Sequence, residues 1–460
     1  MQFCLRLVRQ PAHEEHCCSG REHGDVSRGS LWSHSGSSEQ RLHRDGMCSS
    51  MTDRARLIAG VLLALAIASC AGAAVENHTT VEVSDSAGVS IVSVRIAEDA
   101  QTCEVSGETL RIGAVDEAQG TALYLVNGAV FLSDGRIAVV NRGTSQVKVF
   151  SPAGDLLSEF GRQGQGPGEF KNLWSVHVRG VDTLVVGDYR PWRFSFFTPE
   201  GELLRRVELK PAVIERPDFA IPLEIGAGFV MEEPSFQVQD EWVDRVVPLR
   251  VYGEDGEVTG TVGDFWMDRV GYQSKEIGYV GNPIFGARAS FSHLRDDLVL
   301  YGTGRYEQLE IWNIAGELQG IVRWKSRERE VPPTDVDVWR RQRRESWEAR
   351  FDITPQMEQV IEAQIGEHLP VAHLYPGHDQ VVVSQEGGIW VEEYRRPLDE
   401  GPARWWVFGT DWRFLCSASL PSDLRVLAVG GNRVLGLARD SLDVEYLLGY
   451  DVEYPPARSP

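Results

Sequence analysis

The chain has 460 residues, with 46 Lys and Arg residues against 67 Asp and Glu residues and a formal net charge of −21. Nucleic-acid backbones and anionic lipids both require a basic surface, so this balance argues against electrostatic binding to either. Seven cysteines in a chain of this length do not suggest a disulfide-framework protein.

Residues 1–50 show neither helical nor strand periodicity. The simplest interpretation is a start codon assigned too early, with Met51 as the true first residue; a disordered cytoplasmic extension is the alternative. The run His13-Glu14-Glu15-His16 resembles a set of metal ligands. Because it lies in this upstream stretch, we give it no weight.

Residues 51–70 have the layout of a secretory signal, with Arg54 and Arg56 followed by an apolar run and then small residues before Cys70. The sequence Ile67-Ala68-Ser69-Cys70 resembles a bacterial lipobox, in which the cysteine is lipidated and becomes the new N-terminus. We therefore expect a lipid anchor at Cys70, although an ordinary cleaved signal peptide also fits. Two acyl chains on that cysteine would give stable anchoring without a transmembrane helix.

The chain from residue 71 onward keeps 38 Lys and Arg residues against 60 Asp and Glu residues. Solubility is the plain consequence of this acidic balance. Beyond Cys70 only Cys103 and Cys416 remain. An exported compartment would allow these two to pair, but their spacing alone does not show it.

An internal repeat of 47 residues provides the strongest signal of the fold. The segment 135–157 aligns without a gap with 182–204, so that Ile137 matches Leu184 and Phe150 matches Phe197. Each copy alternates apolar and polar residues, which is the period of a half-buried strand, and carries Pro and Gly at the second turn. The repeated unit is therefore an antiparallel meander.

Weaker copies follow at 248–258, 309–318, 405–415 and 433–451, which makes six. The segment 325–370 breaks the strand pattern, and Thr354 with Pro355 predicts the start of a helix that Gly366 can end. Without this insertion about 48 residues remain for each copy, within the propeller range of about 40–50. We predict an all-β six-bladed β-propeller of four-stranded antiparallel blades over residues 71–454, with a short helical insertion and a tail at 455–460. Part of residues 79–112 is expected to complete the last blade.

The stretches 128–141 and 147–170 are similar to NHL-repeat and related six-bladed propellers, in which a G-x-G-P-x-x-F sequence leads into the next blade. The opening at 81–92 and the ending at 426–452 resemble bacterial six-bladed β-propeller lipoproteins. This resemblance covers nearly all of residues 79–454. It implies the fold and is nearly silent on activity, because propellers host hydrolases, lyases and binding platforms alike.

The glycine-rich stretch 161–170 is the most distinctive candidate for ligand binding, with Arg162 and Glu169 as its charged residues. It does not match a phosphate-binding loop, because no Gly-Lys-Ser/Thr follows. The alternative is a connection between blades, in which the glycines supply positive φ angles and Phe170 packs between two sheets.

Asn141 and Asp188 share one position of the repeat, and Glu393 is a third candidate member of the set. Carboxylates near the axial funnel of a propeller could hold Ca²⁺. Residues of this type more often cap a turn through its backbone, and we favour that interpretation.

Three histidines lie on or near inner strands of the expected blades, namely His177, His293 and His373. The repeat aligns His177 with Val130 and Ser292, which places His293 one position away, on the opposite face of its strand. His373 precedes its strand. We therefore expect no histidine metal centre and predict no cofactor.

No pattern of catalytic residues stands out in the chain from residue 71 onward. We therefore expect a lipid-anchored binding or scaffold module for a protein, peptide or glycan, rather than an enzyme. The expected location is the periplasmic side of a membrane, and Ala71 after Cys70 favours the outer membrane by resemblance to sorting rules. The alternative is a calcium-dependent hydrolase or a lyase with its site in the axial funnel. The insertion at 325–370 is a further candidate for partner docking.

Overall fold

The structure is a computed structural model that describes residues 79–114, 120–189, 192–211, 220–222, 228–233 and 241–456. The expected upstream extension, the signal peptide and Cys70 lie outside these ranges. Within them, no helix combines the length and the apolar character needed to cross a bilayer.

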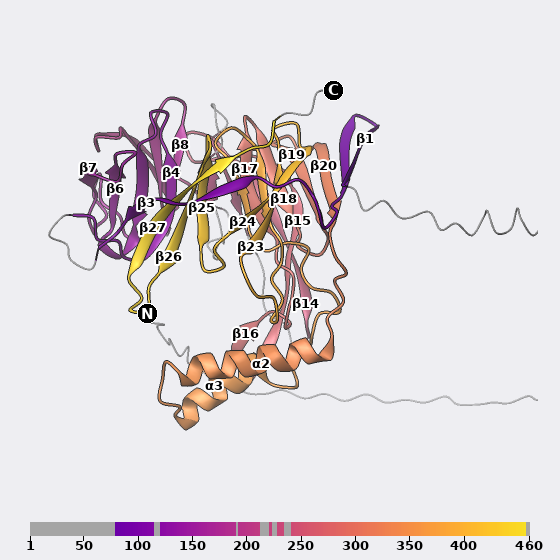
Figure 1. Cartoon of the computed structure of the whole chain (residues 1–460). Helices are drawn as coiled ribbons and strands as arrows, with labels where there is room; N and C mark the ends of the chain where they lie inside the picture. The colour runs from indigo at the N-terminus through magenta and orange to yellow at the C-terminus, as the bar shows by residue number, and fades with distance from the viewer. Residues whose placement is uncertain are drawn as a thin grey trace, which may run out of the picture. The chain divides into compact units, whose positions relative to one another are not determined.

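The strands form six sheets, antiparallel except for one parallel pair, that follow one another along the chain as the repeat predicts (Figure 1). We number these sheets as blades 1 to 6. Blades 1 and 2 have four strands each: β4 (Val126–Phe131), β5 (Ile137–Asn141), β6 (Gln146–Phe150) and β7 (Leu156–Phe160), then β8 (Leu173–Arg179), β9 (Thr183–Asp188), β10 (Arg193–Phe197) and β11 (Leu203–Glu208). Ile137 pairs with Phe150 in blade 1, and Leu184 pairs with Phe197 in blade 2. The two copies of the repeat therefore have the same register.

Blades 3 and 4 contain more than four strands. Blade 3 has β12 (Ala220–Pro222), β13 (Phe229–Glu232), β14 (Val243–Tyr252), β15 (Val258–Ser274) and β16 (Tyr279–Gly281). Blade 4 has β17 (Ser290–Arg295), β18 (Leu298–Gly302), β19 (Gln308–Asn313) and β20 (Leu318–Lys325), followed outward by β2 (Val89–Arg95) and β1 (Thr80–Ser86). Strand β2 is parallel to β20. The first two strands of the described chain thus extend the rim of blade 4, which the sequence did not predict.

Blades 5 and 6 restore the four-stranded pattern. Blade 5 has β21 (Val381–Val383), β22 (Ile389–Glu392), β23 (Ala403–Phe408) and β24 (Phe414–Leu420), and blade 6 has β25 (Arg425–Gly430), β26 (Arg433–Arg439), β27 (Glu445–Glu453) and β3 (Glu104–Ile112). Strand β3 comes from the N-terminal part of the chain and pairs antiparallel with β27, so Figure 1 shows it beside the yellow C-terminal strands. The expectation that part of residues 79–112 completes the last blade is confirmed.

The hydrophobic core is divided among the interfaces between blades. Six clusters of buried apolar side chains each join two neighbouring blades, and one of them joins blade 6 to blade 1 through residues such as Leu435 and Ile137. A sheet that is apolar on both faces must be covered on both sides, and only a closed ring covers all six blades in this way. The chain is a six-bladed β-propeller.

The four tryptophans around blade 5 pack in these interfaces. Trp390 and Trp405 belong to the cluster between blades 5 and 6, and Trp406 belongs to the cluster between blades 4 and 5. Trp412 packs against the latter cluster. Large aromatic rings therefore fill the space between sheets here instead of forming a stacking surface for a ligand.

The helical insertion connects the outer part of blade 4 to the first strand of blade 5. It contains α2 (Pro333–Glu348) and α3 (Pro355–Ile365). Thr354 caps α3 by accepting a hydrogen bond from the backbone N–H of Met357, at the helix start that the sequence predicts. Helix α2 was not predicted, because its 16 residues are mostly charged or polar and bury few apolar side chains.

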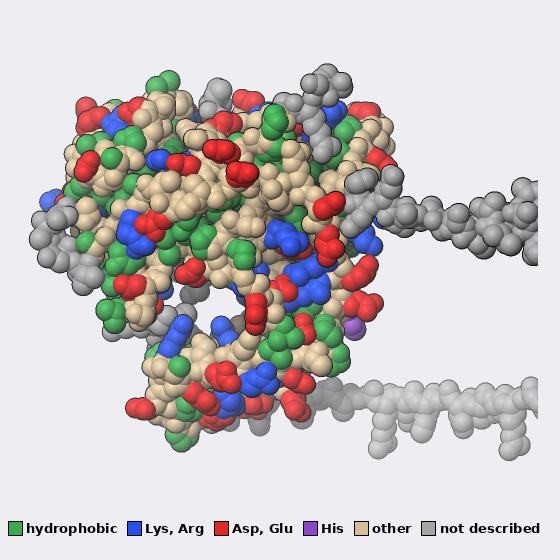
Figure 2. All heavy atoms as spheres, viewed as in Figure 1, with side chains coloured by type: hydrophobic (Ala, Val, Ile, Leu, Met, Phe, Trp, Pro, Cys, Tyr) green, Lys and Arg blue, Asp and Glu red, His purple; other side chains and the backbone are tan. Residues whose placement is uncertain are grey.

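The insertion packs against an extension of blade 3. Strand β13 pairs with β14 only from Leu249 onward, so the first six residues of β14 and the partner residues of β15 project beyond the blade. Residues of this extension, of the insertion and of blade 5 share a seventh apolar cluster around Phe285, Leu369 and Tyr375. The insertion and the extension of blade 3 project from the same face of the ring, which we call the insertion face. The first strand of each blade begins at this face. Figure 2 shows a hollow between the blades and the helices.

A disulfide joins Cys103 to Cys416, with 5.5 Å between the Cα atoms. It links the segment before β3 to the outer strand of blade 5. Two backbone hydrogen bonds flank it: Cys103 N–H donates to the Ser417 carbonyl at 2.8 Å, and Ser417 N–H donates to the Gln101 carbonyl at 2.8 Å. The strand that closes the ring is therefore fixed covalently to the neighbouring blade.

We predict that replacing both cysteines by serine lowers the free energy of unfolding by about 2–5 kcal/mol, because the crosslink restricts the unfolded chain over a separation of 313 residues. The measurement is denaturant unfolding followed by circular dichroism, with and without a reductant. The reductant should destabilise the natural protein and leave the double-serine variant unchanged. Equal midpoints for the two proteins under oxidising conditions would contradict this role.

Candidate functional site

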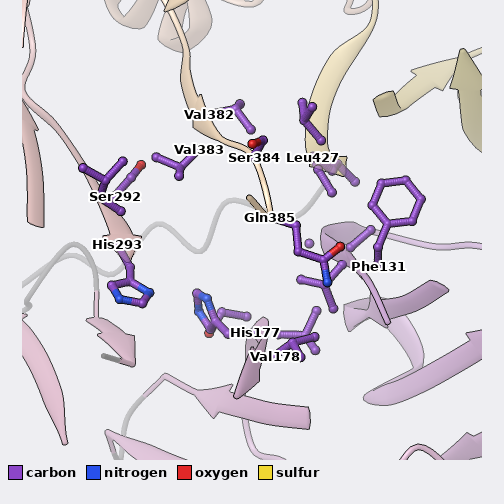
Figure 3. A pocket seen from close by; sticks show the side chains of 18 of the residues that line it. Phe131, His177, Val178, Ser292, His293, Val382, Val383, Ser384, Gln385 and Leu427 are labelled. Carbon is purple, nitrogen blue, oxygen red and sulfur yellow. The ribbon is translucent and has the colours of Figure 1, made fainter. Parts of the chain in front are cut away.

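A cavity of about 640 Å³ lies where the first strands of the blades converge. Strands β4, β8, β17, β21 and β25 supply its described wall. The wall combines apolar side chains with hydroxyls, amides and imidazoles, including Phe131, Val178, Ser175, Ser292, Ser384, Gln380, Gln385, His177 and His293 (Figure 3). This mixture of apolar surface and a few polar groups is typical of small-molecule sites.

Side chains of one blade bind the backbone of the next blade around this cavity. Asn127 donates a hydrogen bond to the Trp174 carbonyl at 2.6 Å, and Gln380 donates to the Val426 carbonyl at 2.6 Å. Arg425 donates to the Val126 carbonyl at 2.7 Å. These bonds tie the inner strands of successive blades together, which makes the cavity wall a preformed surface.

His177 and His293 lie in the same cavity, although the sequence placed them on opposite faces of their strands. The opposite faces and the shared cavity are compatible, because His177 belongs to blade 2 and His293 belongs to blade 4. In β8 the neighbours Val176 and Val178 pack toward blade 1, so His177 is on the face toward blade 3. In β17 Phe291, which shares the face of His293, packs toward blade 3 as well. Opposite faces of blades on either side of blade 3 point toward one another, so His177 and His293 lie on opposite faces of their strands and still line the same cavity.

The imidazole of His177 is held in its neutral form. Burial, and to a smaller extent the proximity of His293, lower the pKa of His177 to about 4. Its Nε2 atom is buried without a hydrogen-bond partner among the described residues. The Nε2 atom of His293 lies 3.1 Å from the Asp296 carbonyl oxygen. A buried polar atom with no protein partner calls for another partner, and a bound ligand or an ordered water would supply one.

Asn141 and Asp188 occupy equivalent positions at the ends of β5 and β9, and both hold turns. The Asn141 side chain accepts a hydrogen bond from the Tyr124 N–H at 2.6 Å. The Asp188 carboxylate accepts from two successive backbone N–H groups, at 3.0 Å and 2.5 Å, and forms a buried ion pair with Arg193. Neither side chain lines the cavity.

The glycine-rich stretch 161–170 forms the connection between blades 1 and 2. Arg162 and Glu169 pair with each other across it at 2.7 Å, and Glu169 also accepts a hydrogen bond from the Gly166 N–H at 2.8 Å. These contacts lower the pKa of Glu169, the Gly166 bond most. Phe170 is fully buried in the cluster between the two blades. The geometry of the stretch is accounted for by blade packing.

Glu393 follows β22 on the insertion face and lies 3.2 Å from Arg327 and 3.8 Å from Arg404. Burial raises its pKa despite these two cations. The pKa of the adjacent Glu392 rises to about 7, chiefly through burial and then through the proximity of Asp379. Glu392 could not be identified from the sequence, because its pKa is set by burial and by the proximity of Asp379 in the folded chain.

The candidate calcium ligands Asn141, Asp188 and Glu393 are not brought together, because they belong to three blades and each has its own partners. Among the described residues, no three His, Cys, Asp or Glu side chains converge as metal ligands. His373 is exposed outside the cavity. Of the residues singled out in the sequence, the cavity therefore collects only His177 and His293.

Comparison with known proteins supports the fold. A family model described as a 6-bladed beta-propeller matches residues 124–184, which cover blade 1 and the start of blade 2. None of the curated proteins matches the sequence.

Among solved structures, the chain is similar to a protein from Bacteroides fragilis described as exported, at 12% identity and a TM-score of 0.45, over 79% of this chain and 99% of that one. It is also similar to a DUF4221 family member from Bacteroides vulgatus, at 12% identity and a TM-score of 0.42, over 78% and 99% of the two chains. A streptogramin B lyase matches at 8% identity and a TM-score of 0.35, over 77% and 98%. At this level of similarity none of them carries an argument about ligand or activity.

We predict that His177→Gln makes the protein more resistant to acid. The native pKa of His177 is about 4 and the unfolded value about 6.5, so between these pH values the unfolded state binds more protons. The contribution of His177 to stability is therefore complete above pH 6.5 and is lost as the pH falls toward 4. Between pH 7 and pH 4 the variant should gain on the order of 1–3 kcal/mol relative to the natural protein. Urea unfolding across this range measures the difference, and His373→Gln, at an exposed position, is the control. A difference that does not change with pH would contradict the assignment.

Proposed function

We propose that the protein is an extracytoplasmic binding module, and that its axial cavity holds a small ligand or an extended part of a protein, peptide or glycan partner. The observation that carries the proposal is the buried, unpartnered Nε2 atom of His177 in a cavity of about 640 Å³. Pockets of about 300–1,000 Å³ are the size that ligands of this class occupy. The cavity wall also carries hydroxyls and amides such as Ser175, Ser292 and Gln385, together with the charged side chains of Arg179, Arg295 and Glu386, so it offers hydrogen-bond partners to a polar ligand.

Binding accounts for this site better than catalysis does. A general base works best when its pKa lies near the working pH, and a pKa of about 4 makes His177 a weak proton acceptor at neutral pH. The residues that a calcium-dependent reaction would use are occupied in turns and ion pairs away from the cavity. A neutral imidazole is, by contrast, well suited to hydrogen bonding with a ligand.

We predict that a ligand of the cavity, identified in a thermal-shift screen of peptides and oligosaccharides, binds His177→Ala more weakly. The loss of one neutral hydrogen bond of about 0.5–1.5 kcal/mol corresponds to a rise in Kd of about 2- to 13-fold. Isothermal titration calorimetry measures the change, with His373→Ala as the control. If the ligand binds His177→Ala as tightly as it binds the natural protein, the axial cavity is not its site.

The same proposal includes a lipid anchor at Cys70 in the membrane facing the periplasm, with Ala71 favouring the outer membrane. Support comes from the order of charged, apolar and small residues before Cys70. The disulfide between Cys103 and Cys416 is consistent with an oxidising, exported location. Nothing in the acidic composition offers another route to an anionic membrane surface.

We predict that Cys70→Ser moves the protein from the membrane fraction to the soluble fraction of the cell envelope and abolishes labelling by radioactive palmitate. The reason is that the two acyl chains on Cys70 would be the only strong link to the bilayer. Ser86→Ala, at an exposed position of β1, is the control and should leave both properties unchanged. Membrane association that survives Cys70→Ser would rule out this anchor.

A further inference from the structure

A second cavity, of about 340 Å³, lies between the extension of blade 3, the helical insertion and blade 5. We propose that it is a binding site for a carboxylated saccharide, independent of the axial cavity. Four aromatic residues, Tyr279, Phe285, Trp339 and Tyr394, form part of its wall. Its volume is near the lower end of the range for small-molecule pockets, about 300–1,000 Å³, which suits one or two sugar rings.

The charge of this cavity is opposite to that of the chain. Among the described residues, its wall includes Arg288 and Arg343 and no Asp or Glu, in a protein whose net charge is −21. Neither arginine forms an ion pair with any residue that the structure describes; Arg288 only donates a hydrogen bond to the Asn282 side chain, at 2.5 Å. A guanidinium presents parallel donors that match a carboxylate, so two unpaired arginines indicate an anionic ligand.

The arginines of α2 divide into two groups. Arg344 pairs with Glu358 of α3 at 2.9 Å, and Arg340 donates to the Gly366 carbonyl at 3.3 Å, so both hold the two helices together. Arg341 and Arg343 take no part in those contacts, and only Arg343 faces the cavity. Arg343 is therefore available to a ligand without cost to the packing of the insertion.

The walls are fixed before any ligand arrives. The ring of Phe285 lies 5.8 Å from that of Trp339 and 5.1 Å from that of Tyr375, which in turn stacks on Tyr394 at 5.6 Å. Phe285 has a φ of 57°, a left-handed conformation that is rare for a bulky residue. Such strain persists only where the surroundings impose it, and it is common at binding sites. A rigid pocket loses little entropy on binding.

The remaining groups distinguish a saccharide from other anions. Side-chain amides of Asn282 and Gln364 can exchange hydrogen bonds with hydroxyls, while aromatic faces accept the apolar face of a sugar ring. A phosphate site typically uses the first turn of a helix, whereas Trp339 and Arg343 lie in the middle of α2. A peptide that bound by strand addition would need a free strand edge, and β16 offers only three residues.

The test is calorimetric titration of the purified protein with trigalacturonate and with a hyaluronan tetrasaccharide. Methyl-esterified trigalacturonate, which keeps the rings and lacks the charge, is the matched ligand control. We expect the protein to bind at least one acidic saccharide. If it binds trigalacturonate, it should bind the methyl ester at least tenfold more weakly than trigalacturonate itself. Arg343→Gln and Arg288→Gln should each weaken binding about tenfold, whereas Arg341→Gln should change it less than twofold. Circular dichroism and melting temperature confirm that each variant is folded.

Four results would overturn the proposal. The first is no binding of either acidic saccharide at 10 mM, and the second is equal binding of the acid and its ester. The third is an equal loss of binding in Arg341→Gln and Arg343→Gln, and the fourth is tighter binding of tri-aspartate than of the saccharides. His177→Ala separates this site from the axial one. If His177→Ala binds the saccharide as tightly as the natural protein does, the result supports the second site, whether or not the axial cavity binds a ligand. If His177→Ala no longer binds the saccharide, the saccharide binds in the axial cavity and the proposal of a second site is wrong.

Discussion

Closure of the ring is the constraint on which the rest of this structure depends. Each blade is apolar on both faces, so it is stable only between two other blades, and the buried clusters occur at every interface from blade 1 round to blade 6. Wedge-shaped interfaces filled by aromatic and branched side chains leave space where the inner strands meet. The axial cavity follows from that geometry, and the hydrogen bonds between successive inner strands keep it open at a fixed size.

Much of this fold could be predicted from the sequence because each copy of the repeat carries the same alternation of apolar residues and the same turn residues. The 47-residue spacing of Ile137 and Leu184, and of the turn residues after them, specifies the strands and their register. Short-range signals also located α3, because Thr354 and Pro355 are typical of a helix start. These signals failed for α2, where four arginines cover a helix that buries little, and they did not predict where β1 and β2 join the ring. Alternating residues identify a strand without identifying its partner, so their addition to blade 4 could not be foreseen.

The site was harder to predict than the fold, since it depends on which faces of different blades point at each other. Asn141 and Asp188 attracted attention as repeated polar residues, and the repetition reflects a shared turn. His177 and His293 break the repeat and were set aside for that reason, yet they meet in the cavity because they lie on either side of blade 3. Similarly, the sequence does not distinguish Arg343 from the other arginines of α2. The structure does, because it shows that a neighbour, Arg344, is used in an ion pair. The burial of each side chain and its hydrogen-bond and ion-pair partners depend on the assembled ring, so they could not be predicted from the sequence.

The pairing of β3 with β27 also has a consequence for how the protein is made. Tyr450 pairs with Glu108, so the two strands that complete blade 6 are separated by most of the chain. Bringing such distant segments together carries a large loop-closure entropy, and contacts of this range slow folding. Until the C-terminal strands have been synthesised, β3 lacks its partner β27 and presents an open edge, which is the kind of surface that aggregates. The ring therefore cannot close while the chain is still being made, because β3, near the beginning of the described chain, must wait for β27 at its end.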